Sequence, residues 1–285
     1  MSRPTAGASR ISERFALLRS RGGKAFVGFV TAGDPSLERT PEIAWQLEAG
    51  GVDVLELGVP FSDPLADGPV IQRASDRALK KGATLAGVLE AVRRIRTRSQ
   101  LPLLLFSYFN PLLRYGLGRL ATDARDAGVD GVLVIDLPPE EATEWLSMAR
   151  PVGLDTVFLA APTSPHERLA SVAEMSRGFV YAVSRTGVTG EQDELGSEAR
   201  PLVERLRGLG AVPVVLGFGI STPEQARAIG RLADGVIVGS ALVGLVERSA
   251  SDAESALTGY LQRLRDALSA ARPAESRSSP SPPRR

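Results

Sequence analysis

One carboxylate lies inside an otherwise apolar segment of this chain. Residues 52–60 read Val-Asp-Val-Leu-Glu-Leu-Gly-Val-Pro, and Glu56 lies at the centre of the run. A buried carboxylate is retained where it is paired or used in chemistry, and desolvation raises its pKa toward the range useful for proton transfer. The position therefore predicts an acid/base residue, with a salt-bridged core glutamate as the alternative.

The loop that follows carries two more carboxylates, Asp63 and Asp67, between prolines and a glycine. It is long for a connection between a strand and a helix, so it could reach over a pocket. The two side chains could bind Mg²⁺, cap the helix expected to begin near Pro69, or face a substrate. Spacing alone makes helix capping the commonest of these outcomes.

Three later turns rich in glycine have the composition of a phosphate site. They are residues 186–190, 217–221 and 239–240, each directly after an expected strand. Glycine lets backbone N–H groups approach an anion, and a short helix after the third turn would direct its positive end to the same place. This arrangement predicts a phosphorylated substrate.

The sequence lacks the residues that several other reaction mechanisms require. The lysines are Lys24, Lys80 and Lys81, and none lies at the C-terminal end of an expected strand, so a Schiff-base mechanism has no amine. The chain has no cysteine, and its single histidine, His166, lies at the start of an expected helix. A thiolate nucleophile and a histidine-rich metal site are therefore excluded, which leaves carboxylate acid/base chemistry.

The elements that must position these residues alternate along the chain. Apolar runs near residues 25–32, 52–59, 102–108, 131–137, 155–161, 179–184, 212–218 and 235–239 predict strands, and stretches such as 40–49, 85–98, 140–150 and 223–231 predict helices. Eight such units favour a closed barrel over an open sheet. We therefore expect an α/β protein whose residues 1–270 form a single (β/α)8 TIM barrel, with its active site at the C-terminal ends of the strands.

Two segments flank the expected barrel. Residues 11–19 predict an extra N-terminal helix across its bottom, and the Pro/Ser/Arg-rich residues 271–285 predict a disordered tail. The net charge of +1 gives no field that would attract nucleic acid or a membrane surface. Without cysteines, a signal peptide or a bilayer-spanning run, we expect a cytoplasmic protein.

Residues 56–69, Glu-Leu-Gly-Val-Pro-Phe-Ser-Asp-Pro-Leu-Ala-Asp-Gly-Pro, closely resemble the signature of tryptophan synthase alpha subunits. Residues 29–35, 108–111, 184–190 and 217–221 resemble further motifs of that family in the same order, and the resemblance covers about 11–270. It implies a lyase that cleaves indole-3-glycerol phosphate by a retro-aldol step, releasing indole and glyceraldehyde 3-phosphate. It implies no cofactor or metal on this chain.

The resemblance also assigns roles to single residues. Glu56 would perform the acid/base work at indole C3 and the adjacent hydroxyl, Asp67 would hydrogen-bond the indole N–H, and Tyr181 would line the site. The remaining assignments are phosphate binding by Gly190, Gly219, Gly239 and Ser240, an indole pocket of Phe29, Ile71, Leu133 and Phe218, and a loop lid at Thr189.

A partner is implied as well. In the family, a beta subunit with pyridoxal phosphate receives the indole through a tunnel for tryptophan synthesis, and an alpha2-beta2 tetramer is expected. Asp63, Asn110 and Pro138 match positions that face this partner. A standalone indole-3-glycerol phosphate lyase would share the same active site. A non-catalytic barrel that only activates the beta subunit is a third possibility, against which the presence of both carboxylates argues.

Two positions depart from the family pattern. Gly28 stands where proline is common, and Phe106 stands where a smaller aliphatic residue is often found. We expect the first to loosen the first strand and the second to narrow the indole pocket.

Overall fold

The computed structural model describes residues 9–183, 192–210, 212–217, 219–248 and 253–271. Its strands form one parallel sheet in the order β5-β4-β3-β2-β1-β9-β8-β7-β6. The strands are β1 (Ala25–Thr31), β2 (Val54–Gly58), β3 (Leu103–Ser107), β4 (Gly131–Val134), β5 (Asp155–Val157), β6 (Leu159–Ala160), β7 (Val180–Val183), β8 (Val214–Gly217) and β9 (Gly235–Val238). The strand order follows the chain order around the sheet, as a barrel requires.

The barrel closes through the fifth predicted strand, which is divided in two. β5 pairs with β4, and β6 pairs with β7. At Phe158, between them, the chain changes partner, and its carbonyl accepts a hydrogen bond of 3.1 Å from the N–H of Tyr181 in β7. The predicted (β/α)8 barrel is confirmed, with one of its eight strand positions filled by two short strands.

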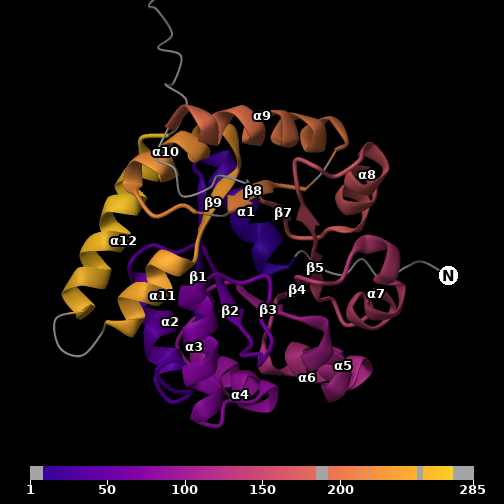
Figure 1. Ribbon diagram of the computed structural model, residues 1–285, viewed down its shortest axis with the longest axis vertical. Coiled ribbons are helices and arrows are strands. Elements are labelled where there is room, and N and C mark those ends of the chain that lie inside the picture. The colour runs from indigo at the N-terminus through magenta and orange to yellow at the C-terminus, as the bar shows by residue number, and fades with distance from the viewer. Residues whose placement is uncertain (1–8, 184–191, 211, 218, 249–252, 272–285) are drawn as a thin grey trace, which may run out of the picture.

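Helices surround the strands (Figure 1). They are α1 (Arg10–Ser20), α2 (Thr40–Ala49), α3 (Pro69–Lys80), α4 (Leu85–Arg96), α5 (Phe109–Tyr115), α6 (Leu117–Ala127), α7 (Thr143–Ala149), α8 (His166–Met175), α9 (Gln192–Gly208), α10 (Pro223–Leu232), α11 (Ser240–Glu247) and α12 (Ala253–Ser269), with a 3-10 turn η1 (Pro139–Glu141) before α7. Local signals explain several boundaries. The Thr84 side chain caps α4 at Gly87 N, and Thr222 and Gln225 form a capping box on α10. No helix of the described segments is long and apolar enough to cross a bilayer.

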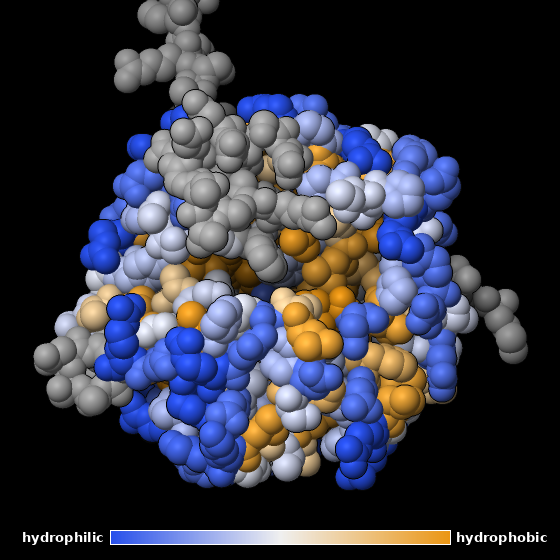
Figure 2. All heavy atoms as spheres, in the orientation of Figure 1, coloured by the Kyte–Doolittle hydropathy of each residue, from blue (hydrophilic) through white to orange (hydrophobic). Residues whose placement is uncertain are grey.

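Alternate residues of the strands pack into two hydrophobic clusters, one inside the barrel and one between the strands and the helices. The inner cluster includes Val27, Phe29, Val54, Leu104 and Leu133, and the outer cluster includes Phe26, Val30, Leu55, Leu57 and Leu105. Because successive side chains of a strand point to opposite faces, Glu56 in β2 and Thr31 in β1 point into the barrel. Figure 2 shows the face at which the strands end, with a hollow at its centre among hydrophobic residues.

The predicted N-terminal helix covers the other end of the barrel. Ile11 and Phe15 of α1 are buried in the inner cluster, and the Phe15 ring lies 5.7 Å from the ring of Phe179. The predicted disordered tail, apart from Ala271, lies outside the described residues.

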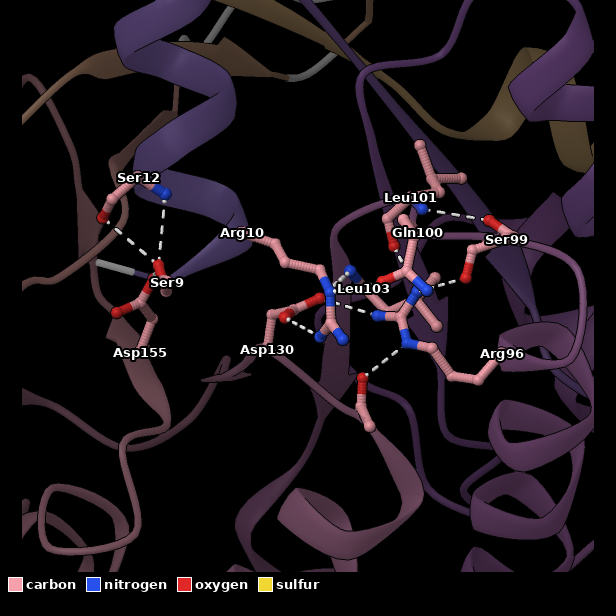
Figure 3. Close-up of polar contacts among 11 residues, drawn as sticks. Ser9, Arg10, Ser12, Arg96, Ser99, Gln100, Leu101, Leu103, Asp130 and Asp155 are labelled. Atoms are coloured by element: carbon pink, nitrogen blue, oxygen red, sulfur yellow. Dashed lines mark hydrogen bonds and ion pairs between the residues drawn. The ribbon is translucent and has the colours of Figure 1, made fainter. Parts of the chain in front are cut away.

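Polar contacts fix α1 to the starts of the strands (Figure 3). Arg10 and Arg96 both bind the buried carboxylate of Asp130, with N–O distances of 2.8 and 2.7 Å. Ser9 at the start of α1 donates a hydrogen bond to Asp155. The carboxylates at this end of the barrel are thus paired, as expected for the end that serves stability.

Candidate active site

Glu56 lies in the middle of β2, in register with Phe29 of β1 and Leu104 of β3. The residue has no exposed surface, and neither carboxyl oxygen has a hydrogen-bond partner among the described residues. Burial raises the pKa of Glu56 to about 8. The alternative of a salt-bridged core glutamate therefore does not describe this residue, and its carboxyl carries a proton at neutral pH.

Two other acidic residues show how this fold treats a buried carboxylate. Asp53 accepts a hydrogen bond of 2.8 Å from Phe26 N and forms an ion pair of 2.9 Å with Arg265. Asp130 is bound by its two arginines and by Leu103 N. Buried polar groups in native proteins are satisfied in this way, so the bare carboxyl of Glu56 indicates a group kept for chemistry.

Glu56 is covered in this conformation. A carboxyl with no exposed surface cannot touch a ligand until side chains around it move. Binding of a substrate ring must therefore displace packed neighbours or turn Glu56 toward the hollow at the barrel mouth.

Asp67 lies in the loop between β2 and α3, where it is half-buried. Tyr108, which follows β3, donates a hydrogen bond of 3.1 Å to Asp67 Oδ2, and its hydroxyl accepts one of 3.0 Å from Ala66 N. Burial raises the pKa of Asp67, and the Tyr108 hydrogen bond opposes that shift. Sequence reasoning assigned Tyr108 no role of its own, although a tyrosine directly after a barrel strand is a signal that could have been used.

The structure bears on the roles considered for Asp63 and Asp67, which are helix capping, Mg²⁺ binding and facing a substrate. α3 begins after Gly68 without a side-chain cap, so neither Asp63 nor Asp67 caps it. Within the described ranges no group of three or more His, Cys, Asp or Glu side chains could hold a metal ion. Asp63 is exposed, whereas Asp67 contacts the tyrosine at the end of the next strand. Capping of α3 is therefore wrong for both residues, and the substrate-facing role of Asp67 stays a prediction.

Tyr181 of β7 points into the barrel and is 8% exposed. Burial raises the pKa of Tyr181, and the charges of Glu56 and Asp67 raise it further, so both carboxyls lie near enough to influence the tyrosine electrostatically. A Cβ at Gly217 of β8 would lie 2.6 Å from the Tyr181 hydroxyl oxygen. Glycine at this position therefore leaves the space that the tyrosine side chain occupies.

The residues expected to bind indole line the same interior. Phe29 and Leu133 are buried in the inner cluster, and the half-buried Ile71 of α3 packs against it. Phe218 lies outside the described residues. The ring of Phe106 stands edge-on to Phe29 with a centroid distance of 5.3 Å and lies 6.5 Å from Tyr181. Phe106 thus lies against one residue of the expected indole pocket, Phe29, and against Tyr181 of the expected site.

The other departure from the family pattern has no visible effect on the strand. β1 runs unbroken through Gly28, which is in register with Leu55 of β2 and Val238 of β9. β1 is thus paired on both sides at Gly28, and the expectation that this glycine loosens the strand stays a prediction.

Three of the four expected phosphate ligands lie at the ends of β8 and β9. Gly239 is the N-cap of α11, and the exposed Ser240 is its first residue. Gly219 follows β8 with a φ of +72°, a conformation that favours glycine. The free N–H groups of a helix start, together with its dipole, form an anion site. Gly190, like the expected lid residue Thr189, lies outside the described residues.

The residues expected to face a partner follow three neighbouring strands. Asp63 after β2 and Asn110 in α5 are exposed, and Pro138 before η1 is half-buried. Two large apolar side chains that sequence reasoning did not single out lie close to them in sequence: Leu65 is 83% exposed and Leu113 is 52% exposed.

The geometry defines a (β/α)8-barrel enzyme with a buried carboxyl in the barrel interior and the start of α11 at the barrel mouth. The family model described as "Tryptophan synthase alpha chain" matches residues 15–271. The chain belongs to this family.

Relatives and solved structures agree over nearly the whole chain. The tryptophan synthase alpha chain of Citrifermentans bemidjiense is 51% identical over 261 residues, covering 91% of this chain and 98% of that one. That of Burkholderia pseudomallei is 48% identical over 269 residues, covering 93% and 99%. The crystal structure of tryptophan synthase subunit alpha from Legionella pneumophila is similar with a TM-score of 0.85 at 36% identity, covering 93% of this chain and 100% of that chain. A structure of tryptophan synthase from M. tuberculosis in its aminoacrylate-bound form has a TM-score of 0.83 at 36% identity, covering 92% and 100%.

Proposed function

We propose that this chain cleaves indole-3-glycerol phosphate to indole and glyceraldehyde 3-phosphate inside the barrel mouth, with Glu56 as the acid/base group. The observation that carries the assignment is the carboxyl of Glu56, which is buried without a partner among the described residues in a fold that pairs Asp53 and Asp130. Membership of the tryptophan synthase alpha chain family supplies the substrate and the reaction.

Glu56 begins the reaction in its protonated form, since its pKa of about 8 keeps the proton at neutral pH. It donates that proton to indole C3, and the ring nitrogen takes on iminium character. The carboxylate so formed then accepts the proton of the hydroxyl on the adjacent carbon. As that oxygen forms the aldehyde, the electrons of the carbon–carbon bond return to the ring, which leaves as neutral indole, and Glu56 has regained a proton.

Asp67 accepts the hydrogen bond of the indole N–H and offsets the positive charge that develops on the ring. Its hydrogen bond from Tyr108 favours the ionised form of the carboxylate, which this role requires. Tyr181 lines the proposed active site beside the reacting groups.

The rest of the site holds the two ends of the substrate. The start of α11 and the turn at Gly219 bind the phosphate through backbone N–H groups, with Ser240 adding a hydroxyl. Gly190 completes the phosphate site in the proposal, and the loop of Thr189 serves as a lid. Phe29, Ile71, Leu133 and Phe218 enclose the indole ring, a planar apolar group suited to the inner cluster.

A pyridoxal-phosphate-dependent beta subunit receives the indole in the complete enzyme, and an alpha2-beta2 tetramer is the proposed assembly. Asp63, Asn110 and Pro138 contact that partner, and the exposed Leu65 and Leu113 add the apolar area that a stable interface needs. Because Asp63 and Asp67 share one loop, a partner that orders Asp63 also orders Asp67.

The test of the assignment is the Glu56→Gln variant. The amide keeps the shape of the side chain and cannot transfer the proton, so cleavage is abolished while the substrate still binds. Glu144→Gln, at an exposed glutamate of α7, is the matched control and retains full activity. Release of glyceraldehyde 3-phosphate is measured for turnover and titration calorimetry for binding. Substantial turnover in the Glu56→Gln variant would contradict the assignment of Glu56 as the acid/base group.

The beta subunit is tested separately by titrating it into this chain and following glyceraldehyde 3-phosphate release. We expect the rate to rise with added beta subunit and the Asp63→Ala variant to respond less. A constant rate in the wild-type titration would favour the standalone lyase. An Asp63→Ala response equal to that of the wild type would refute activation through this loop.

A further inference from the structure

A second polar side chain inside the barrel has no partner. Thr31 is the last residue of β1 and is 3% exposed, and its Oγ1 forms no hydrogen bond within the described part of the chain. A hydroxyl is both a donor and an acceptor, and nearly all buried hydroxyls are satisfied. The hydrogen-bonding capacity of Thr31 Oγ1 is therefore used by none of the described residues.

Thr31 lies one inward-facing position beyond Glu56 toward the barrel mouth. Phe29 is in register with Glu56, and Thr31 is in register with Gly58, two residues further along β2. Two residues of a strand span about 7 Å, so the hydroxyl and the Glu56 carboxyl stand at successive levels of the interior. Gly58 has no side chain that could partner the hydroxyl from the neighbouring strand.

β1 also separates Glu56 from the proposed phosphate site. In the sheet, β1 lies between β2, which carries Glu56, and β9, which leads into α11. Gly28 is in register with Val238, and a Cβ placed on Gly239 would lie 3.6 Å from the Cβ of Phe29. The end of β1 is therefore the part of the rim that a molecule crosses when it reaches from Glu56 to the start of α11.

The substrate has such a shape. Its three-carbon chain joins the indole ring to the phosphate and carries two hydroxyls, one beside the ring and one on the middle carbon. The hydroxyl beside the ring gives its proton to Glu56 in the proposed reaction. The hydroxyl on the middle carbon has no assigned partner, and it lies between the two ends that the proposal places on either side of β1.

We propose that Thr31 Oγ1 hydrogen-bonds the hydroxyl on the middle carbon of the substrate chain and makes the site specific for a hydroxylated chain. This inference rests on the proposed function. A site built to hydrogen-bond a ligand hydroxyl discriminates against the analogue that lacks it, because its own buried polar group then stays unpaired. Thr31 acts in binding and specificity, and it transfers no proton.

The test compares two ligands and two substitutions. Thr31→Val keeps the shape and removes the hydroxyl, and Thr31→Ser keeps the hydroxyl. Both are placed in the Glu56→Gln background, so that no turnover occurs, and titration calorimetry measures binding of indole-3-glycerol phosphate and of its deoxy analogue, which lacks only the hydroxyl on the middle carbon. We expect Thr31→Val to weaken binding of the first ligand about tenfold and of the second less than about twofold, with Thr31→Ser near the parent for both.

The outcomes separate the two claims. Equal weakening for both ligands would show that Thr31 only supports the packing, and unchanged affinity for indole-3-glycerol phosphate would show that the hydroxyl makes no contact; either result overturns the inference and leaves the proposed function standing. A wild-type chain that neither binds nor cleaves indole-3-glycerol phosphate would overturn the proposed function and the inference with it.

Discussion

The buried carboxyl of Glu56 makes the stability of this protein depend on pH in a defined direction. Burial raises its pKa from the ordinary value of 4.5 to about 8. Between these two pH values the folded chain keeps the proton and the unfolded chain loses it, so the free energy of unfolding falls as the pH rises. Each pKa unit corresponds to about 1.4 kcal/mol. Relative to its value below pH 4.5, the free energy of unfolding is therefore lower by about 3 kcal/mol at pH 7 and by about 5 kcal/mol above pH 8.

The Glu56→Gln variant removes this titration, because the amide carries no ionisable proton. We expect the stability of the variant relative to the wild type to be nearly constant below pH 4.5, to rise by about 1.4 kcal/mol per pH unit up to about pH 8, and to level off above it. The comparison cancels the groups that titrate in both proteins.

Urea unfolding of both proteins at half-unit steps from pH 4.5 to 9, followed by circular dichroism, measures this difference. Glu144→Gln, at an exposed glutamate, is the control and should differ from the wild type by a constant amount. A difference between the Glu56→Gln variant and the wild type that stays flat across the range would mean that Glu56 is ionised or solvated in the folded chain, and the reasoning about its proton would fail.

Three further outcomes are expected. Tyr108→Phe removes the hydrogen bond that lowers the pKa of Asp67, so the acidic limb of the kcat/KM profile moves to higher pH; an unmoved limb would contradict the role given to that bond. Arg77→Met removes the two contacts, at 2.9 and 2.7 Å, that the guanidinium makes with the buried carboxylate of Asp34, and we expect it to lower the unfolding free energy in urea titrations by about 2 to 4 kcal/mol. The control is Arg73→Met, at an exposed arginine 3.4 Å from Glu247, which changes that free energy by less than about 1 kcal/mol. EDTA leaves the rate of glyceraldehyde 3-phosphate release unchanged, and a loss that Mg²⁺ restores would overturn the assignment of Asp67 to the indole ring.

The sequence by itself determined the elements and the main acid/base candidate. Residues 40–49 were predicted as a helix and form α2 over the same span, because apolar periodicity acts over a few residues. The predicted strands end within a few residues of the observed ones for the same reason. Glu56 stood out because a carboxylate in a buried apolar run is costly whatever surrounds it.

Less local features of the elements escaped prediction. The helix expected over residues 140–150 is the 3-10 turn η1 followed by α7, since Ala142 ends one and precedes the other. The fifth strand is two strands, because the chain changes pairing partner at Phe158. Both outcomes depend on which neighbours are present, which the local pattern does not contain.

Only the tertiary structure decided which polar groups are paired. Asp53 and Glu56 lie three residues apart in one apolar run, yet Asp53 is bound by Arg265, far along the chain, while Glu56 has no partner in the part of the chain that the structure describes. Asp67 likewise does not cap α3, and its hydrogen-bond partner is Tyr108, which follows the next strand. Pairing is set by distances across the barrel, and these follow from strand register and closure, which join residues from all parts of the chain. The inference about the substrate chain rests on the Thr31 hydroxyl, which has no partner among the described residues. Only the tertiary structure shows this.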